Sequence, residues 1–386
     1  MVAAPPPELV GLYVLPDDGV EPLIREIDAA ACTVDLSVYL LSDPLVIDGL
    51  ARASDRGVEV RVMLEEHPYG GGGNQDDIRD ELIAHGIEVR WSGSQLRFSH
   101  AKFLVIDAAV AVIMNQNLTP SAFTSNREFA VMTTIPEVVL QAQEVFDRDW
   151  DHEDINDPPG PLILSPSNSR QRLVDIINGA DSSIQFYAEI IRDEEIADSL
   201  KAALGRGVRI QLIVDRSIDG QMRGLLADLA SEGLEIRESS ALYIHAKLMI
   251  VDGDLAVVGS QNPTPTSLDQ NREVSMVTDD DLVVDRASMI FGRDWIRGVP
   301  FAEPATQAGM VSGWNAFQVY LRHSNVETPS IAMAHPANTT CWPKTVASVD
   351  MLSVEAGITP LNAKPLTLST RPRIASGANC CSRVWI

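Results

Sequence analysis

The chain alternates short apolar runs with segments whose apolar residues recur at helical spacing. The runs, rich in β-branched residues, predict buried strands, and the segments between them predict helices. Ser42-Asp43-Pro44 marks one helix start, because proline is favoured in the first turn. In the first part of the chain the predicted strands are Thr33–Leu41, Val58–Leu64, Phe103–Ile106, Val110–Met114 and Phe129–Thr133. The predicted helices there are Asp43–Ser54, Asp76–His85 and Pro136–Trp150.

The same order of elements returns in the second part. Its predicted strands are Ile184–Ile190, Ile210–Val214, Leu248–Val251, Ala256–Val258 and Val274–Val277. Its predicted helices are Asn168–Asn178, Glu194–Leu204, Met222–Ser231 and Asp281–Trp295. Each part mixes strand–helix–strand units with a hairpin, centred on Asp107 in one and on Gly253 in the other. This order predicts an α/β sandwich with a mixed sheet.

The two parts also repeat in sequence. Asn126-Arg127-Glu128 recurs as Asn271-Arg272-Glu273, and Phe146–Trp150 recurs as Phe291–Trp295, both at an offset of 145 residues. A unit of this length is too long for a solenoid repeat and indicates a duplicated domain. We therefore expect two similar halves that face each other, residues 1–158 and residues 159–299.

Residues 300–386 have no counterpart in the repeat. They contain eight prolines and no sustained helical or strand period. This composition predicts a tail of low order, with a small added domain or a read-through product as alternatives. We assign no chemistry to this segment.

Composition places the chain among globular proteins, with 45% hydrophobic and 22% charged residues. The net charge is −24, and residues 300–386 hold four acidic and six basic side chains, so the acidity belongs to the two halves. Nucleic-acid binding depends largely on Lys and Arg that neutralise phosphates. The acidic body therefore argues against a nucleic-acid partner and against strongly acidic membranes.

Targeting and redox signals are weak. No apolar run reaches the roughly 20 residues that span a bilayer, and the first residues lack the basic start and apolar stretch of a signal peptide. Localisation thus stays open between the cytoplasm and export with a leader missing. Of the four cysteines, Cys32 is expected to be buried and three lie in the tail without partners for a metal set.

The strongest chemical signal is a motif that occurs twice. It opens with His100-Ala-Lys102 and again with His245-Ala-Lys247. In both copies an aspartate follows the histidine by seven residues and an asparagine by seventeen: Asp107 and Asn117, Asp252 and Asn262. Side chains two apart on a strand share a face, so each imidazole lies beside its ammonium. Two such sets among only seven histidines predict one paired catalytic site.

A pair of histidines suits displacement at a phosphodiester. One imidazole attacks phosphorus to give a phosphohistidine, and the other protonates the departing alkoxide and then deprotonates the acceptor. Lys102, Lys247, Asn117 and Asn262 are expected to stabilise the phosphoryl oxygens. We expect no cofactor and no metal, because two lysines supply the charge and the sequence offers no HExxH, CxxC or carboxylate cluster.

Carboxylates are needed to fix the imidazole tautomers. Glu128 and Glu273 are the candidates, and the alternative is that Arg-Glu forms an exposed pair on a strand. Asp107 and Asp252 lie at the hairpin bends, where turn chemistry is at least as plausible as contact with substrate.

The doubled HxKxxxxD pattern with a Gly-Ser-x-Asn element resembles the HKD signature of the phospholipase D superfamily, and the resemblance covers roughly residues 20–300. It implies two α/β domains related by a pseudo-twofold axis, one site at their interface and a metal-independent phosphohistidine mechanism. It also implies His100 as nucleophile and His245 as acid and base. The sequence departs from the pattern in the first copy, where Met114-Asn115 stands for the Gly259-Ser260 of the second.

The resemblance leaves three substrate classes open. We expect a phospholipase D-type phosphodiesterase that hydrolyses or transphosphatidylates glycerophospholipids to phosphatidic acid and an alcohol, working as a monomer on a membrane or micelle surface. The alternatives are an endonuclease of the same family, disfavoured by the acidity, and a cardiolipin synthase-like phosphatidyltransferase, disfavoured by the lack of a transmembrane segment.

Overall fold

The computed structural model describes residues 9–71 and 74–302. The predicted tail therefore lies outside the described residues except for its first three positions. The first half consists of β1 (Val10–Leu15), α1 (Glu21–Ala29), β2 (Thr33–Val38), α2 (Pro44–Asp55), β3 (Glu59–Leu64), η1 (Tyr69–Gly71), α3 (Gln75–Ala84), β4 (Glu88–Trp91), β5 (Phe103–Ile106), β6 (Val110–Met114), α4 (Pro120–Thr124), β7 (Asn126–Thr133) and α5 (Pro136–Trp150).

The second half repeats this order. It consists of β8 (Ile163–Ser165), α6 (Ser169–Gly179), β9 (Ser183–Ala188), α7 (Glu194–Gly205), β10 (Arg209–Val214), α8 (Gly220–Ser231), β11 (Glu235–Glu238), β12 (Tyr243–Ile244), β13 (Lys247–Val251), β14 (Leu255–Gly259), α9 (Pro265–Asp269), β15 (Glu273–Thr278), α10 (Asp281–Arg297) and β16 (Val299–Pro300).

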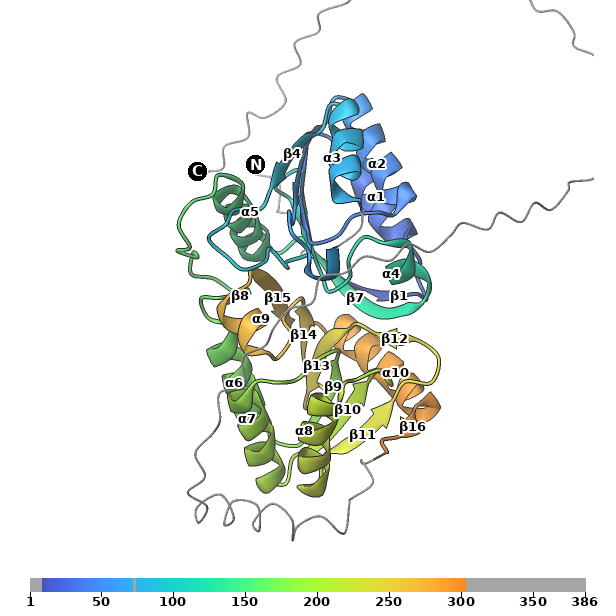
Figure 1. Ribbon diagram of the computed structural model, residues 1–386, viewed down its shortest axis with the longest axis vertical. Coiled ribbons are helices and arrows are strands. Elements are labelled where there is room, and N and C mark those ends of the chain that lie inside the picture. Colours follow the sequence, from blue (N-terminus) through green and yellow to red (C-terminus); the bar gives the residue numbers. More distant parts are fainter. Residues whose placement is uncertain (1–8, 72–73, 303–386) are drawn as a thin grey trace, which may run out of the picture. The chain divides into compact units, whose positions relative to one another are not determined.

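Each half contains a mixed sheet with the same strand order. The first sheet runs β1-β7-β6-β5-β2-β3-β4, and the second runs β8-β15-β14-β13-β9-β10-β11 with β16 added at its edge. In both, three strands pair in parallel (β2-β3-β4 and β9-β10-β11) and the hairpin strands pair antiparallel. The predicted α/β fold of two duplicated halves with mixed sheets is confirmed (Figure 1).

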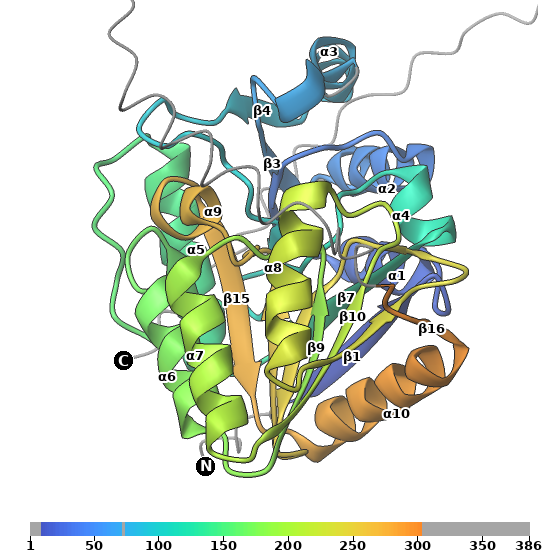
Figure 2. The ribbon, with the colours of Figure 1, turned by 60° about the horizontal axis from the view of Figure 1, so that its bottom comes forward.

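The two sheets share a central core. Outside it, helices α1, α2 and α3 cover the first sheet, and α6, α7 and α8 cover the second (Figures 1 and 2). Between the halves, α5 and α10 bury apolar side chains in one cluster with strands of both sheets. The rings of Phe129 on β7 and Tyr187 on β9, one from each half, lie 5.3 Å apart between centroids. One cooperative core therefore fixes the halves against each other.

Local sequence explains why these elements start where they do. Asp43 caps α2 by accepting hydrogen bonds from the backbone N–H groups of Leu45 and Val46, and Pro44 occupies the first turn. α1 begins without any side-chain cap, and β4 is a short, partly exposed strand. In the first half α1, β1, β4 and α4 lie outside the predicted elements. The strand expected over residues 33–41 ends at Val38.

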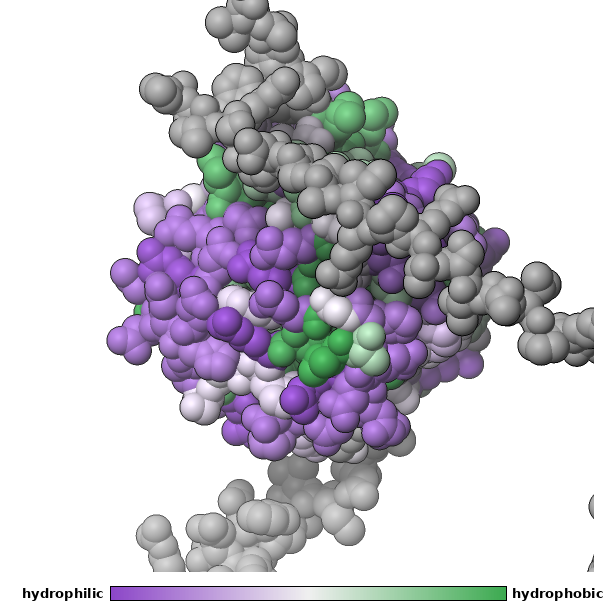
Figure 3. Space-filling model, turned by 90° about the horizontal axis from the view of Figure 1, so that it is seen from above, coloured by the Kyte–Doolittle hydropathy of each residue, from purple (hydrophilic) through white to green (hydrophobic). Residues whose placement is uncertain are grey.

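Figure 3 shows one face that is mainly hydrophilic around a small apolar area, with part of it covered by atoms drawn in grey. Within the described part of the chain, no helix combines the length and the apolar character that a bilayer crossing requires.

Candidate active site

The strand that precedes each histidine pairs with the other half. β12, directly before His245, pairs in parallel with β7, so that Ile244 lies opposite Arg127. In the same way Ser99, directly before His100, bridges Arg272 in parallel, and the His100 N–H donates to the Arg272 carbonyl at 2.9 Å. This reciprocal exchange brings the two halves of the duplicated motif to one interface.

The exchange decides which glutamate holds which histidine. His100 Nδ1 lies 2.8 Å from Glu273 Oε2, and His245 Nδ1 lies 2.8 Å from Glu128 Oε1. Both glutamates are fully buried. The two carboxylates named from the sequence therefore contact imidazoles, but each serves the histidine of the opposite half. Each half therefore depends on the other to orient its histidine.

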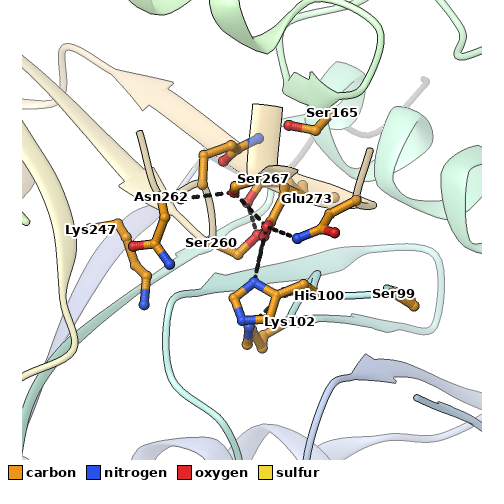
Figure 4. A network of polar contacts seen from close by, with 12 residues as sticks. Ser99, His100, Lys102, Ser165, Lys247, Ser260, Asn262, Ser267 and Glu273 are labelled. Carbon is orange, nitrogen blue, oxygen red and sulfur yellow. Dashed lines mark hydrogen bonds and ion pairs between the residues drawn. The ribbon is translucent and has the colours of Figure 1, made fainter. Parts of the chain in front are cut away.

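The environment of His100 favours a neutral ring. Burial lowers the pKa of His100 to about 4, and the nearby Lys102 adds to this, outweighing the raising effect of Glu273. Burial by itself raises the pKa of Glu273, but His100 and Lys102 lower it more, so the carboxylate stays ionised. An ionised oxygen at Nδ1 keeps the ring proton there, which leaves the lone pair on Nε2. Figure 4 shows Glu273 between Ser267 and His100.

Each lysine follows its histidine by two residues. Lys102 Nζ donates to the His100 carbonyl at 2.6 Å, and Lys247 Nζ donates to the His245 carbonyl at 2.7 Å. Lys102 is fully buried, and its burial lowers the pKa of the ammonium to about 7 despite the raising effect of Glu273. Lys247 also donates to Glu189 Oε2 at 2.6 Å. Two ammonium groups therefore lie beside the two imidazoles.

The two asparagines differ in what they contact. Asn262 Nδ2 donates to Glu189 Oε2 at 3.2 Å, and its side chain lies beside Lys247 (Figure 4). The Oδ1 atoms of Asn117 and Asn262 are buried and have no hydrogen-bond partner within the described part of the chain. A buried amide with an unpaired oxygen costs free energy unless a ligand or water satisfies it.

Asn115 and Ser260 make equivalent hydrogen bonds to the backbone. The Oδ1 of Asn115 accepts from the Phe129 N–H at 2.8 Å, and the Oγ of Ser260 accepts from the Val274 N–H at 3.1 Å. Both positions are fully buried and join equivalent strand pairs. Asparagine therefore replaces serine without loss of the bond. Met114 fits because it lies opposite Ala130, whereas Gly259 lies opposite Ser275, against which a Cβ would clash.

Asp107 and Asp252 hold turns. Each adopts a positive φ, 52° and 55°, at the bend of its hairpin. The carboxylate of Asp252 accepts from the N–H groups of residues 181–183 at 2.7–2.9 Å, and that of Asp107 accepts from residues 31–33 at 2.6–2.8 Å. Of the two roles open for these aspartates, the structure describes the turn role.

The arginine of each Asn-Arg-Glu segment also crosses between halves. Arg127 Nε lies 2.7 Å from Asp294, and Arg272 Nη2 lies 2.7 Å from Asp149. Both arginine side chains are only 2% exposed, so the alternative of an exposed strand pair is wrong. The partner aspartates come from the repeated Phe-x-Arg-Asp-Trp segment of α5 and α10. The repeat of that segment was the signal that could have identified these pairs.

One further site residue was missed. Glu189 follows β9, and besides Lys247 and Asn262 its Oε2 lies 3.6 Å from His245 Nε2. Its counterpart in the first half is Tyr39, whose ring centroid lies 4.7 Å from that of His100. Because the two residues differ, comparison of the repeats gave no signal for either.

Comparison with known proteins identifies the family of this chain. The family model "Cardiolipin synthase, PLD-like domain" matches residues 23–150 and 173–295. Cardiolipin synthase A of Yersinia pseudotuberculosis serotype O:1b (strain IP 31758) is 23% identical over 319 residues, which cover 70% of this chain and 65% of the relative. Cardiolipin synthase A of Erwinia tasmaniensis is 23% identical over 314 residues, 69% of this chain and 64% of the relative. The match thus spans about two-thirds of the length of these relatives.

Solved structures share the fold. Phosphatidylserine synthase from Haemophilus influenzae Rd KW20 superimposes with a TM-score of 0.61 at 12% identity, covering 75% of this chain and 86% of that one. Polyphosphate kinase from Porphyromonas gingivalis gives a TM-score of 0.60 at 16% identity, covering 81% of this chain and 55% of that one. At such identities the likeness extends to the fold alone. The family model, by contrast, matches both halves over most of the described residues, and the chain therefore belongs to the phospholipase D superfamily, in the family of the cardiolipin synthase PLD-like domain.

Proposed function

We propose that this chain is a phosphatidyltransferase, which moves a phosphatidyl group from a glycerophospholipid to an alcohol acceptor through a phosphohistidine. The observation that carries the proposal is the pair of histidines, each held at Nδ1 by a buried glutamate of the opposite half and each accompanied by a lysine. Two equivalent acid–base groups facing one site suit a reaction in which one alcohol leaves and another enters.

In the first step the lone pair of His100 Nε2 forms a bond to phosphorus, and the bond from phosphorus to the leaving alcohol oxygen breaks. His245 gives its Nε2 proton to that oxygen. The neutral state of His100, whose pKa is lowered to about 4 by burial, supports it as the nucleophile. Lys102 and Lys247 stabilise the charge that develops on the phosphoryl oxygens.

In the second step the acceptor hydroxyl gives its proton to His245, and its oxygen attacks phosphorus. The phosphorus–nitrogen bond breaks and returns His100 to its first state. Water in place of the alcohol gives phosphatidic acid, so transfer and hydrolysis use the same residues. What separates them is which acceptor reaches the site.

The comparisons favour an alcohol over water, against our expectation of a mainly hydrolytic enzyme. The family description and the curated relatives name cardiolipin synthases, and a structural neighbour is named a phosphatidylserine synthase. All three names denote synthesis rather than lipid degradation. The acceptor is therefore proposed to be a hydroxyl of another lipid or of a small alcohol.

The test is to incubate the protein with mixed-lipid vesicles that contain labelled phosphatidylglycerol, and to identify the products by mass spectrometry. We expect a diphosphatidyl product and free glycerol from wild type, and loss of both with His100→Ala and His245→Ala. His67→Ala removes an imidazole whose side chain is 84% exposed and serves as the matched control. Phosphatidic acid as the sole product would return the assignment to hydrolysis. Cleavage of an oligonucleotide with intact lipid would replace it by a nuclease.

A further inference from the structure

The second half of the site already contains an anion. Glu189 Oε2 accepts hydrogen bonds from Lys247 Nζ at 2.6 Å and from Asn262 Nδ2 at 3.2 Å, and it lies 3.6 Å from His245 Nε2. The Glu189 side chain is 16% exposed. One carboxylate oxygen thus contacts the ammonium, the amide and the imidazole of one motif copy.

Those three groups are the ones expected to surround a phosphoryl oxygen. Burial alone would raise the pKa of Glu189, but His245 and Lys247 lower it by more. The pKa therefore lies well below its usual range, and the carboxylate is ionised. A carboxylate oxygen and a phosphoryl oxygen accept the same charge-assisted hydrogen bonds. A phosphoryl group and Glu189 therefore compete for the same donors.

The first half has no such competitor at the matching position. Tyr39 stands there, and its ring centroid lies 5.2 Å from Lys102 Nζ. Its hydroxyl accepts from the Tyr69 N–H at 2.6 Å. Tyr39 therefore does not act as an anion beside Lys102. The two halves thus present different surfaces to a phosphate: a lysine against an aromatic ring, and a lysine paired with a carboxylate.

We propose that Glu189 fills the phosphoryl subsite of the second half in the empty enzyme, and that a substrate phosphate binds by displacing it from Lys247 and Asn262. The inference rests on the proposed function in so far as Lys247 and Asn262 hold the phosphoryl group there. Every ligand of this subsite must then replace Glu189.

The displaced carboxylate has another donor within reach. Tyr243 Oη lies 3.5 Å from Glu189 Oε1, and this tyrosine is 43% exposed. Burial, followed by the charges of Glu189 and Asp215, raises the pKa of Tyr243, so that its hydroxyl keeps its proton. A rotation of the Glu189 side chain toward Tyr243 would keep and shorten this hydrogen bond while it frees Lys247.

Displacement of Glu189 costs the same free energy for every ligand of this subsite. A small anion such as free phosphate must break the contacts between Glu189 and Lys247 with no other binding energy to offset the loss. A phospholipid brings acyl chains and a second ester group that contact the protein elsewhere and offset this cost.

The experiment is calorimetric titration of the full-length protein with inorganic phosphate near pH 7. Glu189→Gln removes the charge and keeps the size, whereas Glu189→Asp keeps the charge and withdraws it by one methylene group. We expect phosphate to bind about 10- to 100-fold more tightly to Glu189→Gln, the range that charge-assisted hydrogen bonds carry. Glu189→Asp should also bind more tightly, by a smaller factor. Glu232→Gln, an exposed charge-matched control, should bind as wild type does.

Three results would overturn the proposal. Tighter binding by Glu189→Gln with wild-type binding by Glu189→Asp would show that charge acts from a distance, without occupancy. Equal binding by all variants would show that Glu189 is not displaced, and absence of binding by all would show that no such subsite exists. Binding requires no turnover, so the expected pattern in a protein that transfers no phosphatidyl group would reject the proposed function and leave the displacement intact.

Discussion

Replacement of Glu273 by glutamine tests the role of the exchanged carboxylates. Glu273 Oε1 accepts from Ser267 Oγ at 2.6 Å and from Asn271 Nδ2 at 3.1 Å, while His100 Nδ1 lies 2.8 Å from Oε2 and 3.0 Å from Oε1. In the variant the amide oxygen must take the place of Oε1, because two donors already point there. The amide nitrogen then takes the place of Oε2, the atom nearer to His100 Nδ1, and donates to that ring nitrogen.

This inversion moves the ring proton. If Nδ1 accepts a hydrogen bond, the proton of the neutral His100 ring goes to Nε2, and the nucleophilic lone pair disappears from the site. A carboxylate-to-amide change with the same consequence in a catalytic triad lowers kcat about 10⁴-fold. We expect a loss of about 10³- to 10⁴-fold here, equivalent to about 4–5.5 kcal/mol of transition-state stabilisation. KM should change little, because Glu273 contacts the imidazole and its supporting side chains rather than the substrate.

The assay is the initial rate of phosphatidyl transfer in mixed-lipid vesicles, with thermal unfolding as a check on the fold. Ser267→Ala is the matched control, since it removes one bond to Glu273 and one from the Asn262 N–H but leaves the charge. The first half carries Ala122 at that position, so the architecture tolerates the smaller residue. We expect less than a tenfold loss for this control. A folded Glu273→Gln protein that keeps more than a tenth of the wild-type rate would refute the tautomer argument.

Four further outcomes are expected. Arg272→Met leaves Asp149 and Asp157 buried without their partner and should lower the free energy of unfolding by about 3–5 kcal/mol in denaturant titrations. Arg209→Met, at an exposed ion pair, is the control and should lower it by less than about 1 kcal/mol. Backbone hydrogen bonds outweigh the raising effect of burial and lower the pKa of Asp252 to about 2 from 3.8. The ionised carboxylate therefore stabilises the fold above pH 4, and this stabilisation is lost as the pH falls toward 2. The difference in Tm between wild type and Asp252→Asn should shrink over that range. Burial lowers the pKa of Lys102 to about 7, so this side chain loses its charge as the pH rises. Sulfate does not change its own charge in this range and should bind more weakly to wild type above pH 7. Its binding to Lys102→Met should show no such trend. A chain that ends at Ala302 should fold and keep its activity, because β16 pairs with β11 and Phe301 packs on the second core; insolubility of this product would show that the fold needs the residues beyond.

The regular elements were predictable where the apolar period was strong. The hairpins β5–β6 and β13–β14, with their bends at Asp107 and Asp252, follow from β-branched runs around a turn signal. β1 was not predictable in this way, because its place is set by pairing with β7 more than a hundred residues later. An edge strand of this kind is defined by tertiary contacts that a local pattern does not contain.

The types of residue in the candidate catalytic set were predictable from the sequence, but which glutamate contacts which histidine was not. The repeat offers two histidines and two glutamates, and the same sequence is compatible with pairing inside each half or across the halves. The choice is made by the backbone: Ser99 and Ile244 pair with Arg272 and Arg127 of the opposite half, and this carries each histidine to the other glutamate. Only a three-dimensional register supplies that information.

Asymmetry between the halves was the least predictable feature. The departure that the sequence shows is in the first motif copy, Met114-Asn115. The structure gives Asn115 the same backbone bond as Ser260, but its Nδ2 is buried without a hydrogen-bond partner in the described residues, whereas the Ser260 hydroxyl also contacts Glu273. A second difference lies at the ends of β2 and β9, where Tyr39 and Glu189 lie beside the two histidines. Because those positions fall outside the repeated motif, comparing the motif copies with each other does not reveal them. The carboxylate that faces Lys247 makes the second half, rather than the first, the one whose phosphate binding is expected to be unusual.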